Sequence, residues 1–406
     1  MHPTKTAIKI QIIIAAILLG VARHGETHGL TFPSAPPLGP TPSEADLIFT
    51  DQRLAAVFPI IQNFKSLITS DPFNVTATWA GPDVCAYKGF YCESPPDNRS
   101  ATALASIDFN GFRLAAPTLA GFLDRLPDLA LFHANSNDFG GAIPPGTAAL
   151  PYLYELDVSN NRLSGPFPAA VVGMAGLAFL DLRFNALSGA VPPQLFGRRG
   201  LDALFINNNL FATRLPDNLG ATHIVYLTLA NNRFFGPIPR SISRTFSNVS
   251  EILLLNNLLS GCLPYELGFL TEAAVIDAGG NRLTGPLPPS LGCLQSLEAL
   301  NLAGNLLYGQ VPEALCWLGK VANLSLSENY FTGVGPACWR LISNGVLDVR
   351  RNCIPGFTSQ RSVAECAAFF ARPPRFCPYM PVYGRIPCRL PPRYAADLPQ
   401  LAPSPE

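Results

Sequence analysis

Two aspartates, Asp157 and Asp181, stand at equivalent places in successive copies of a recurring sequence pattern. A pair of carboxylates is the group that most glycosidases use as acid and nucleophile. A general acid, however, needs a desolvated carboxyl group with a raised pKa. Neighbouring strands would instead set these two side chains on an open, wet surface about one strand spacing apart. The pair therefore predicts no glycosidase activity.

Other catalytic patterns are absent from the sequence. It holds no HExxH, no GxSxG and no Gly-rich phosphate-binding loop. We interpret His133 as a surface contact residue rather than as a catalytic base. We therefore expect no catalytic residues and a protein that is not an enzyme.

Ten cysteines are the next candidates for chemistry. A metal site built on Cys85 and Cys92 would need two further ligands. The histidines available beyond the first 22 residues are His24, His28, His133 and His223. We therefore expect no metal and no cofactor. Ten cysteines in an exported chain predict disulfides instead, which also leaves no free thiol as a nucleophile.

All ten cysteines are predicted to be paired: Cys85, Cys92, Cys262, Cys293, Cys316, Cys338, Cys353, Cys366, Cys377 and Cys388. The first two are close enough in sequence to close a small loop. Cys316 and Cys338 fall at nearly the same place in successive repeats, which brings their α-carbons within disulfide reach. Cys262 and Cys293 are paired mainly by elimination. The last four allow three pairings, and the sequence does not choose among them.

The elements that position these residues are set by one recurring stretch, LYELDVSNNRLSGPFP at 153–168. Its pattern LxxLxLxxNxL returns about every 24 residues. The asparagine of this frame stands at 137, 161, 185, 209, 232, 257, 281, 305, 329 and 352. A weaker unit precedes these, with Phe112 in place of the asparagine. The sequence therefore contains about eleven repeats.

The repeat frame predicts how each unit folds. Apolar residues two apart in LxL belong to one face of a short strand. The asparagine can bond backbone groups where the chain turns, and the following Gly and Pro suit the return path. No unit can bury its apolar edge alone, so the units must stack. The predicted fold is an α/β leucine-rich-repeat solenoid of the 24-residue plant type, capped by disulfides at both ends.

The composition changes along the chain and predicts six segments. A basic start and an apolar run indicate a signal peptide at 1–22. A flexible Pro-rich leader (23–45), an N-terminal helical cap (46–100) and the repeats (101–354) follow. A Cys-rich cap (355–390) and a disordered Pro-rich tail (391–406) complete the chain. Apolar spacing predicts one or two helices from Phe49 to Ile68, interrupted or kinked at Pro59, and a short helix near Ser362–Ala371.

Several other features of the sequence agree with export of the chain from the cell. Four Asn-x-Ser/Thr sequons suit a glycoprotein and stand at Asn74, Asn98, Asn248 and Asn323. No later stretch has about 18 continuous apolar residues, so we expect no membrane span in the mature chain. Loss of Lys5 and Lys9 with the signal peptide changes 28 basic and 28 acidic residues to 26 and 28. That balance argues against a general polyanion binder, including a nucleic-acid binder.

The concave face of the solenoid is the predicted binding surface. One residue between the two apolar positions of LxL is expected to face solvent in each unit. Acidic residues gather in the first units and aromatic residues follow, and a patch of this kind marks a contact surface. The candidate contact residues are Asp108, His133, Glu155, Asp157, Phe179, Asp181, Phe184, Phe205 and Tyr226. Acids beside aromatics suit a basic peptide with an apolar anchor, although a polysaccharide would also stack on aromatics.

Several segments resemble the repeat domain of the plant leucine-rich-repeat extensins. They are SDPFNVTATWAGPDVCAYKGFYC, IDFNGFRLAAPTL, LSGCLPYELGFL, LGCLQSLEALNLAGNLLYGQVPEALC and RRNCIPGFTSQRSVAECAAFF, within about residues 45–380. The resemblance implies a secreted protein of the plant cell wall that binds basic, cysteine-rich signalling peptides of the rapid-alkalinisation type, forms homodimers and regulates wall growth. The sequence departs from that family because no serine–polyproline repeats follow, which puts wall anchoring in doubt.

Two other functions fit a secreted repeat protein of this kind. One resembles the polygalacturonase-inhibiting proteins, which share the repeat frame and block a wall-degrading enzyme. Those proteins are usually shorter and lack this C-terminal cysteine region. The other is a purely structural wall protein. The partner that co-purifies with the secreted chain, a small basic peptide or a hydrolase, distinguishes the first two hypotheses.

Overall fold

The computed structural model describes residues 47–243 and 248–371 together with Cys377 and Cys388. From Ile48 onward the described residues belong to one compact unit. The predicted signal peptide (1–22), leader (23–45) and Pro-rich tail (391–406) lie outside the described residues. None of the helices in the described part of the chain is both long and apolar enough to cross a bilayer.

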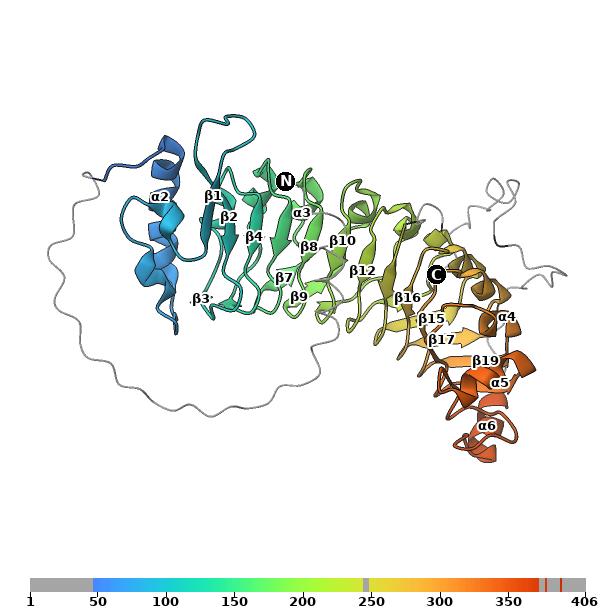
Figure 1. Ribbon diagram of the computed structural model, residues 1–406. Helices are drawn as coiled ribbons and strands as arrows, with labels where there is room; N and C mark the ends of the chain where they lie inside the picture. Colours follow the sequence, from blue (N-terminus) through green and yellow to red (C-terminus); the bar gives the residue numbers. More distant parts are fainter. Residues whose placement is uncertain (1–46, 244–247, 372–376, 378–387, 389–406) are drawn as a thin grey trace, which may run out of the picture. The chain divides into compact units, whose positions relative to one another are not determined.

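A twelve-stranded sheet runs the length of this unit (Figure 1). Its first strand, β1 (Phe90–Glu93), pairs antiparallel with β2 (Ala103–Asp108), and every later pair is parallel. The later strands are β4 (Leu131–His133), β6 (Glu155–Asp157), β8 (Phe179–Asp181), β10 (Ala203–Phe205), β12 (Tyr226–Thr228), β14 (Glu251–Leu253), β16 (Val275–Asp277), β18 (Ala299–Asn301), β20 (Asn323–Ser325) and β22 (Leu347–Asp348). From β2 onward there is one parallel strand per predicted unit, which confirms the solenoid and its eleven repeats.

A second set of short strands follows the frame asparagines, and the sequence analysis did not predict it. β3 (Ala115–Ala116) pairs with β5 (Asp138–Phe139). A three-stranded sheet contains β7 (Ser164–Pro166), β9 (Ala186–Gly189) and β11 (Leu210–Phe211). A five-stranded sheet contains β13 (Phe235–Gly236), β15 (Leu258–Cys262), β17 (Arg282–Gly285), β19 (Leu306–Val311) and β21 (Tyr330–Val334).

Short helical turns return the chain to the next strand. Three of them are α-helical: α3 (Ala170–Gly173), α4 (Glu313–Cys316) and α5 (Pro336–Ser343). The others are 3₁₀ turns: Leu123–Arg125, Pro145–Ala149, Pro193–Gly197, Leu219–Ala221, Arg240–Ser243, Tyr265–Phe269 and Pro289–Cys293. Several begin with proline, whose missing N–H and fixed φ suit the first position of a helix. Each unit therefore forms a closed coil that stacks on the next.

The frame asparagines join each unit to its neighbours. Asn281 is typical: its Nδ2 donates to the carbonyl of Leu254 in the preceding unit at 3.0 Å and to that of Ala278 at 3.1 Å. Its Oδ1 accepts from the backbone N–H of Leu259 at 3.0 Å. Buried backbone groups need such partners when no ladder supplies them. The expected role of the asparagine at the turn is confirmed.

The N-terminal cap is one continuous helix followed by an aromatic cluster. α2 (Gln52–Leu67) begins at Asp51, whose side chain accepts from the backbone N–H of Arg53 at 2.8 Å. Pro59 lies within this helix and does not interrupt it, contrary to expectation. On the buried side of this helix, Phe64 stacks on Phe122 with ring centroids 3.9 Å apart. The cluster covers the apolar edge of the first repeat, which a terminal unit would otherwise expose.

The C-terminal cap contains the predicted short helix, α6 (Val363–Phe370). Ser362 and Glu365 form a reciprocal capping box at its start. A disulfide between Cys353 and Cys366 fixes the helix to the end of the last repeat. The expectation that the last four cysteines pair among themselves is wrong, because Cys377 and Cys388 bond to cysteines of the repeats, so none of the three open pairings occurs.

All ten cysteines form disulfides, as predicted. Two predicted pairs are confirmed, Cys85–Cys92 and Cys316–Cys338. The predicted Cys262–Cys293 bridge is wrong, because the actual bridges are Cys262–Cys377 and Cys293–Cys388. Cys262 ends a strand of the five-stranded sheet, whereas Cys293 ends a 3₁₀ turn on the return path, so the two occupy different parts of the coil.

Candidate functional site

The twelve-stranded sheet brings the predicted contact residues together in two adjacent columns. Asp108, His133, Asp157, Asp181 and Phe205 are paired in register across β2, β4, β6, β8 and β10. Glu155, Phe179 and Tyr226 belong to the second column, two residues earlier on their strands. Parallel strands lie about 4.8 Å apart, so neighbours within a column can act on one ligand. We call the solvent side of these two columns the sheet face.

Two of the predicted contact residues are buried and do not reach solvent. Asp181 is 0% exposed and Phe205 is 5% exposed. Arg183 covers both: its guanidinium pairs with Asp181 at 2.7 Å and lies 5.1 Å from the centre of the Phe205 ring. Phe179 adds an edge-to-face contact with Phe205 at 5.5 Å. The expectation that Asp181 and Phe205 face solvent is therefore wrong.

The burial of Asp181 also changes its acidity. Burial and, to a smaller extent, the nearby Asp157 carboxylate raise the pKa of Asp181 to about 7 against the opposing effect of Arg183. The expectation of two carboxylates on an open, wet surface is therefore wrong for Asp181, and Asp157 is half-buried. Both oxygens of Asp181 accept hydrogen bonds from the Arg183 side chain. A carboxyl group held in this way is turned away from any ligand on the sheet face.

Asp348 provides a contrast in the same column. Arg350 pairs with it at 2.8 Å, just as Arg183 pairs with Asp181. Here the hydrogen bonds from Arg350 lower the pKa of the carboxyl group, and desolvation is the weaker effect. Asp348 lies on β22, the last strand, with a neighbour on one side only. Asp181 lies on the inner strand β8, in register with Asp157 on one side and Phe205 on the other, and has no solvent exposure.

His133 bridges the two columns at the acidic end of the sheet face. Its Nε2 lies 2.9 Å from a carboxylate oxygen of Glu155. That hydrogen bond raises the pKa of His133, with further contributions from Asp157 and Asp108. The arrangement fits the predicted surface contact role, and the imidazole offsets part of the acidic charge when it is protonated.

Four carboxylates remain available on the sheet face. Asp108, Asp157, Glu251 and Asp277 make no ion pair with a basic side chain within residues 47–243 and 248–371. Burial raises the pKa values of Glu251 and Asp277, which are both half-buried. Glu251 follows Tyr226 across the strand pair β12–β14 and was missed by the sequence analysis, although it occupies the same column as Glu155.

Three aromatic side chains border these acids. Phe179 and Tyr226 are half-buried, and Phe184 is 39% exposed at a turn with a positive φ of 51°. Over the described residues, no group of His, Cys, Asp and Glu side chains is arranged to hold a metal ion. The sheet face thus offers acid and aromatic contacts for a partner.

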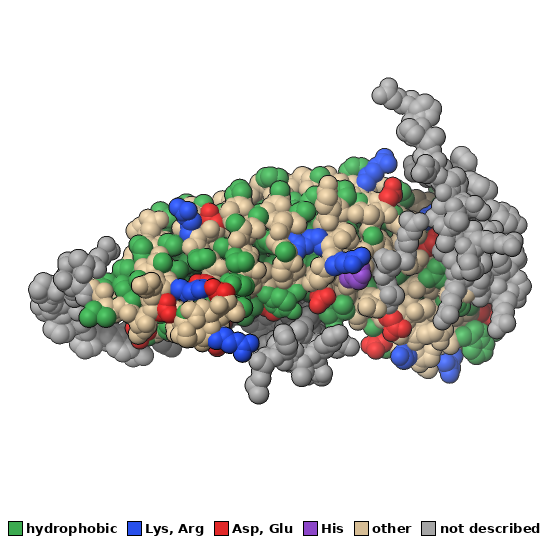
Figure 2. All heavy atoms as spheres, turned by 90° about the horizontal axis from the view of Figure 1, so that it is seen from above, with side chains coloured by type: hydrophobic (Ala, Val, Ile, Leu, Met, Phe, Trp, Pro, Cys, Tyr) green, Lys and Arg blue, Asp and Glu red, His purple; other side chains and the backbone are tan. Residues whose placement is uncertain are grey.

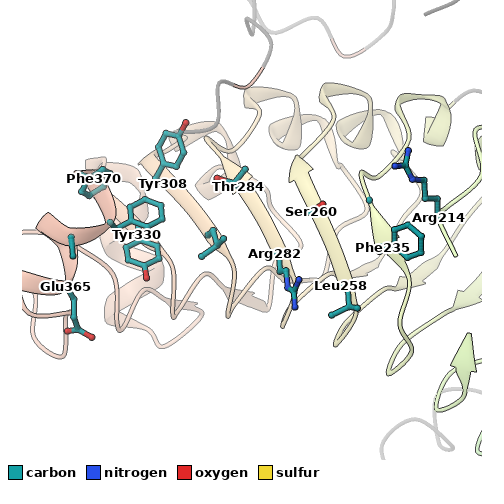
Figure 3. Close-up of a pocket in the computed structure, with 14 residues that line it drawn as sticks. Arg214, Phe235, Leu258, Ser260, Arg282, Thr284, Tyr308, Tyr330, Glu365 and Phe370 are labelled. Atoms are coloured by element: carbon teal, nitrogen blue, oxygen red, sulfur yellow. The ribbon is translucent and has the colours of Figure 1, made fainter. Parts of the chain in front are cut away.

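A second concave surface lies between the five-stranded sheet and α6, and the sequence analysis missed it (Figure 3). It is a groove of about 1010 Å³. Tyr308, Tyr330 and Phe370 lie at one end and Phe235 with Arg214 at the other (Figure 3). The sequence signal was the apolar residue directly after the frame asparagine at Leu258 and Leu306, where three other units carry arginine.

Charged side chains are otherwise scattered over the molecule. Figure 2 shows the face seen from above Figure 1, where basic and acidic groups are interspersed. The four sequon asparagines are all exposed, and Asn323 is the first residue of β20. Their glycosylation stays a prediction.

Comparison with known proteins identifies related sequences. The family model for the leucine-rich repeat matches residues 152–174. Leucine-rich repeat extensin-like protein 6 of Arabidopsis thaliana is 51% identical over 80% of this chain and 68% of the relative. Extensin-like protein 1 of the same plant is 44% identical over 28% of this chain, which spans only 15% of that relative.

Solved structures share the fold. A TDR receptor matches with a TM-score of 0.54 and 31% identity over 59% of this chain and 41% of the receptor. The Arabidopsis receptor kinase HAESA was solved with the peptide hormone IDA and the co-receptor SERK1. It matches with a TM-score of 0.50 and 25% identity over 73% of this chain and 61% of the HAESA chain. These likenesses, together with the disulfides, indicate an extracellular repeat domain that binds other proteins or peptides. On the extent of its match to extensin-like protein 6, the chain belongs to the leucine-rich repeat extensin-like family.

Proposed function

We propose that this protein is secreted to the plant cell wall, where it binds a small basic, cysteine-rich signalling peptide and so modulates wall growth. The observation that carries this proposal is the set of carboxylates without a basic partner that is spread along the sheet face: Asp108, Asp157, Glu251 and Asp277. A basic peptide is the partner whose charge complements these carboxylates. The peptide-bound HAESA ectodomain, which shares the fold, supports the use of a repeat solenoid for this purpose.

The carboxylates would mainly set the association rate, and the aromatic side chains would mainly set the dissociation rate. Exposed charges accelerate encounter with an oppositely charged partner, and salt screens this effect. Phe179 and Tyr226 would bury apolar surface against the peptide and slow its release. Phe205 is excluded as an anchor, because Arg183 and Phe179 already cover it.

The test compares variants of the full chain for binding to a basic, cysteine-rich peptide at low and high salt. Asp108→Asn with Asp157→Asn should lower the association rate chiefly at low salt. Tyr226→Ala should raise the dissociation rate at both salt concentrations, by about tenfold or more. The matched control is Asp217→Asn, which removes an exposed acid away from the sheet face.

Surface plasmon resonance gives both rates. Equal rates for all variants and the parent would place the peptide elsewhere, and the groove of Figure 3 would be the next surface to test. Mass spectrometry of co-purifying material gives an independent check. A wall hydrolase without any basic peptide would contradict the proposal and favour an enzyme inhibitor.

A further inference from the structure

The chain has three tryptophans, and they divide sharply by exposure. Trp79 is fully buried in the N-terminal aromatic cluster, whereas Trp317 is 74% exposed and Trp339 is 59% exposed. Tryptophan gains a large free energy by leaving water, so two exposed indoles in one region need an explanation. Exposed apolar surface of this kind commonly marks a binding site.

The fold holds the two indoles as neighbours. Trp317 directly follows Cys316 at the end of α4, and Trp339 directly follows Cys338 in α5. The disulfide between the two cysteines sets their α-carbons 5.1 Å apart. Both cysteines are buried, so the residue after each is turned outward. The Cys316–Cys338 disulfide therefore joins two adjacent coils at the points where the two indoles project outward.

A further contact fixes one of the rings. The Trp339 ring makes an edge-to-face contact with Phe357 at 6.2 Å. A side chain held in one orientation loses less entropy when a ligand arrives. The pair is thus a preformed platform on the helical connections, away from the sheet face and the groove.

Two cations lie next to the indoles in sequence. Lys320 follows in the turn after α4, and Arg340 follows Trp339 in α5. Both are exposed, and neither makes an ion pair within residues 47–243 and 248–371. Glu313, an acid at the start of α4, accepts a hydrogen bond from the backbone N–H of Ala337 at 3.2 Å. The local charge beside the indoles is therefore positive.

We propose that Trp317 and Trp339, with Lys320 and Arg340, form a binding site for an acidic polysaccharide built of uronic acids. A pyranose ring presents a face of C–H groups that stacks on an indole, and a uronate adds a carboxylate that a cation attracts. A protein partner fits less well, because the flanking apolar residue Leu318 is buried and leaves little further apolar surface. The site lies apart from the sheet face and does not depend on peptide binding.

The test titrates the full chain with an unesterified oligogalacturonate and with a neutral gluco-oligosaccharide at low and high salt. Calorimetry gives the affinity, and tryptophan fluorescence reports contact, because buried Trp79 supplies a constant background. We expect the parent to prefer the uronate and to bind it more weakly at high salt. Trp317→Ala and Trp339→Ala should each weaken binding by about tenfold or more.

Two further variants make the test specific. Lys320→Gln with Arg340→Gln should weaken uronate binding and remove its salt dependence. Tyr154→Ala removes an exposed aromatic near the sheet face and should leave uronate binding unchanged. Thermal unfolding shows whether each variant is folded. If an alanine variant is not, Trp317→Phe and Trp339→Phe keep a smaller ring and should bind with intermediate affinity.

Several results would overturn the proposal. One is that the parent shows no detectable binding of the uronate. Another is that the parent and the folded tryptophan variants bind the uronate with equal affinity. Equal binding of the uronate and the neutral oligosaccharide at both salt concentrations would reject an acidic ligand. A protein captured by the parent and lost from the double tryptophan variant, without uronate binding, would assign the platform to a protein partner.

Discussion

At the scale of single residues, Asp181 and Asp348 show how far the repeat frame can predict a site. Both occupy the same column, and each pairs with an arginine two residues later. The period-two alternation of strands predicts that column correctly. It does not predict exposure, because exposure depends on the residues of adjacent strands. Asp181 has Asp157 and Phe205 on the adjacent strands and is buried, whereas Asp348 lies on the last strand and is half-buried.

Asp181→Asn should change how stability depends on pH. Because the folded-state pKa is raised from its usual value of about 4 to about 7, the folded protein binds the proton more tightly than the unfolded chain. The favourable contribution of the protonated carboxyl is therefore complete below pH 4 and is lost as pH rises to about 7. The side chain of the asparagine variant cannot ionise, so the variant does not lose this stability as the pH rises. At pH 8 it should be more stable than the parent, by on the order of 1 kcal/mol or more.

Asp348→Asn is the matched control, with the opposite sign. The folded-state pKa of Asp348 is lowered, so its contribution is present at neutral pH and is lost on acidification. This variant should be less stable than the parent at neutral pH, with a smaller difference in acid. Urea unfolding between pH 3 and pH 8 measures both. A constant difference between Asp181→Asn and the parent across that range would contradict the assigned pKa.

At the scale of elements, the recurring asparagine predicted the main strands and their order. The second set of strands was not predicted, because they are as short as two residues, as in β11 and β13, and carry no alternation of their own. The Cys262–Cys293 error has a related cause. The position of a cysteine along the repeat indicates in which part of the coil it lies. It does not indicate which repeat a cysteine from the Pro-rich segment after the repeats will contact.

Asn305→Ala should destabilise the solenoid by on the order of 3 kcal/mol, because several buried backbone groups lose their partners. Its Nδ2 donates to the carbonyl of Ala278 at 3.0 Å, and its Oδ1 accepts from the N–H of Leu283 at 3.0 Å. Asn344→Ala, at an exposed turn after α5, serves as the control and should cost little. Denaturant unfolding compares the two. Equal stability of both variants would show that water replaces the frame asparagine without loss.

At the scale of the whole molecule, the cross-links are distributed unevenly. No cysteine lies between Cys92 and Cys262, so the repeats from β4 to β12 are held by non-covalent interactions. Four of the five disulfides lie from Cys262 onward. Gly285 makes one of them feasible, because any side chain there would collide with the sulfur of Cys377.

Reduction should therefore loosen the N-terminal cap and the later repeats before the middle ones. Each disulfide typically contributes about 2–4 kcal/mol. Hydrogen exchange in reducing buffer should show faster exchange from β15 onward and around Cys85, with little change from β6 to β10. Cys377→Ser with Cys262→Ser should reproduce part of this effect without reductant. Loss of protection first at β6 to β10 would show that the bridges do not set local stability.

The two long-range bridges also determine how the protein carries mechanical load. Cys293–Cys388 closes a covalent ring across 95 residues, and Cys262–Cys377 closes another across 115. Tension applied to the backbone beyond Cys388 passes through the sulfur atoms into the solenoid at Cys293. The last repeats and α6 lie inside the ring and are shielded, so they cannot lengthen the chain by unravelling. Under pulling, the cysteine-free coils would yield first, and the oxidised C-terminal end would keep its shape.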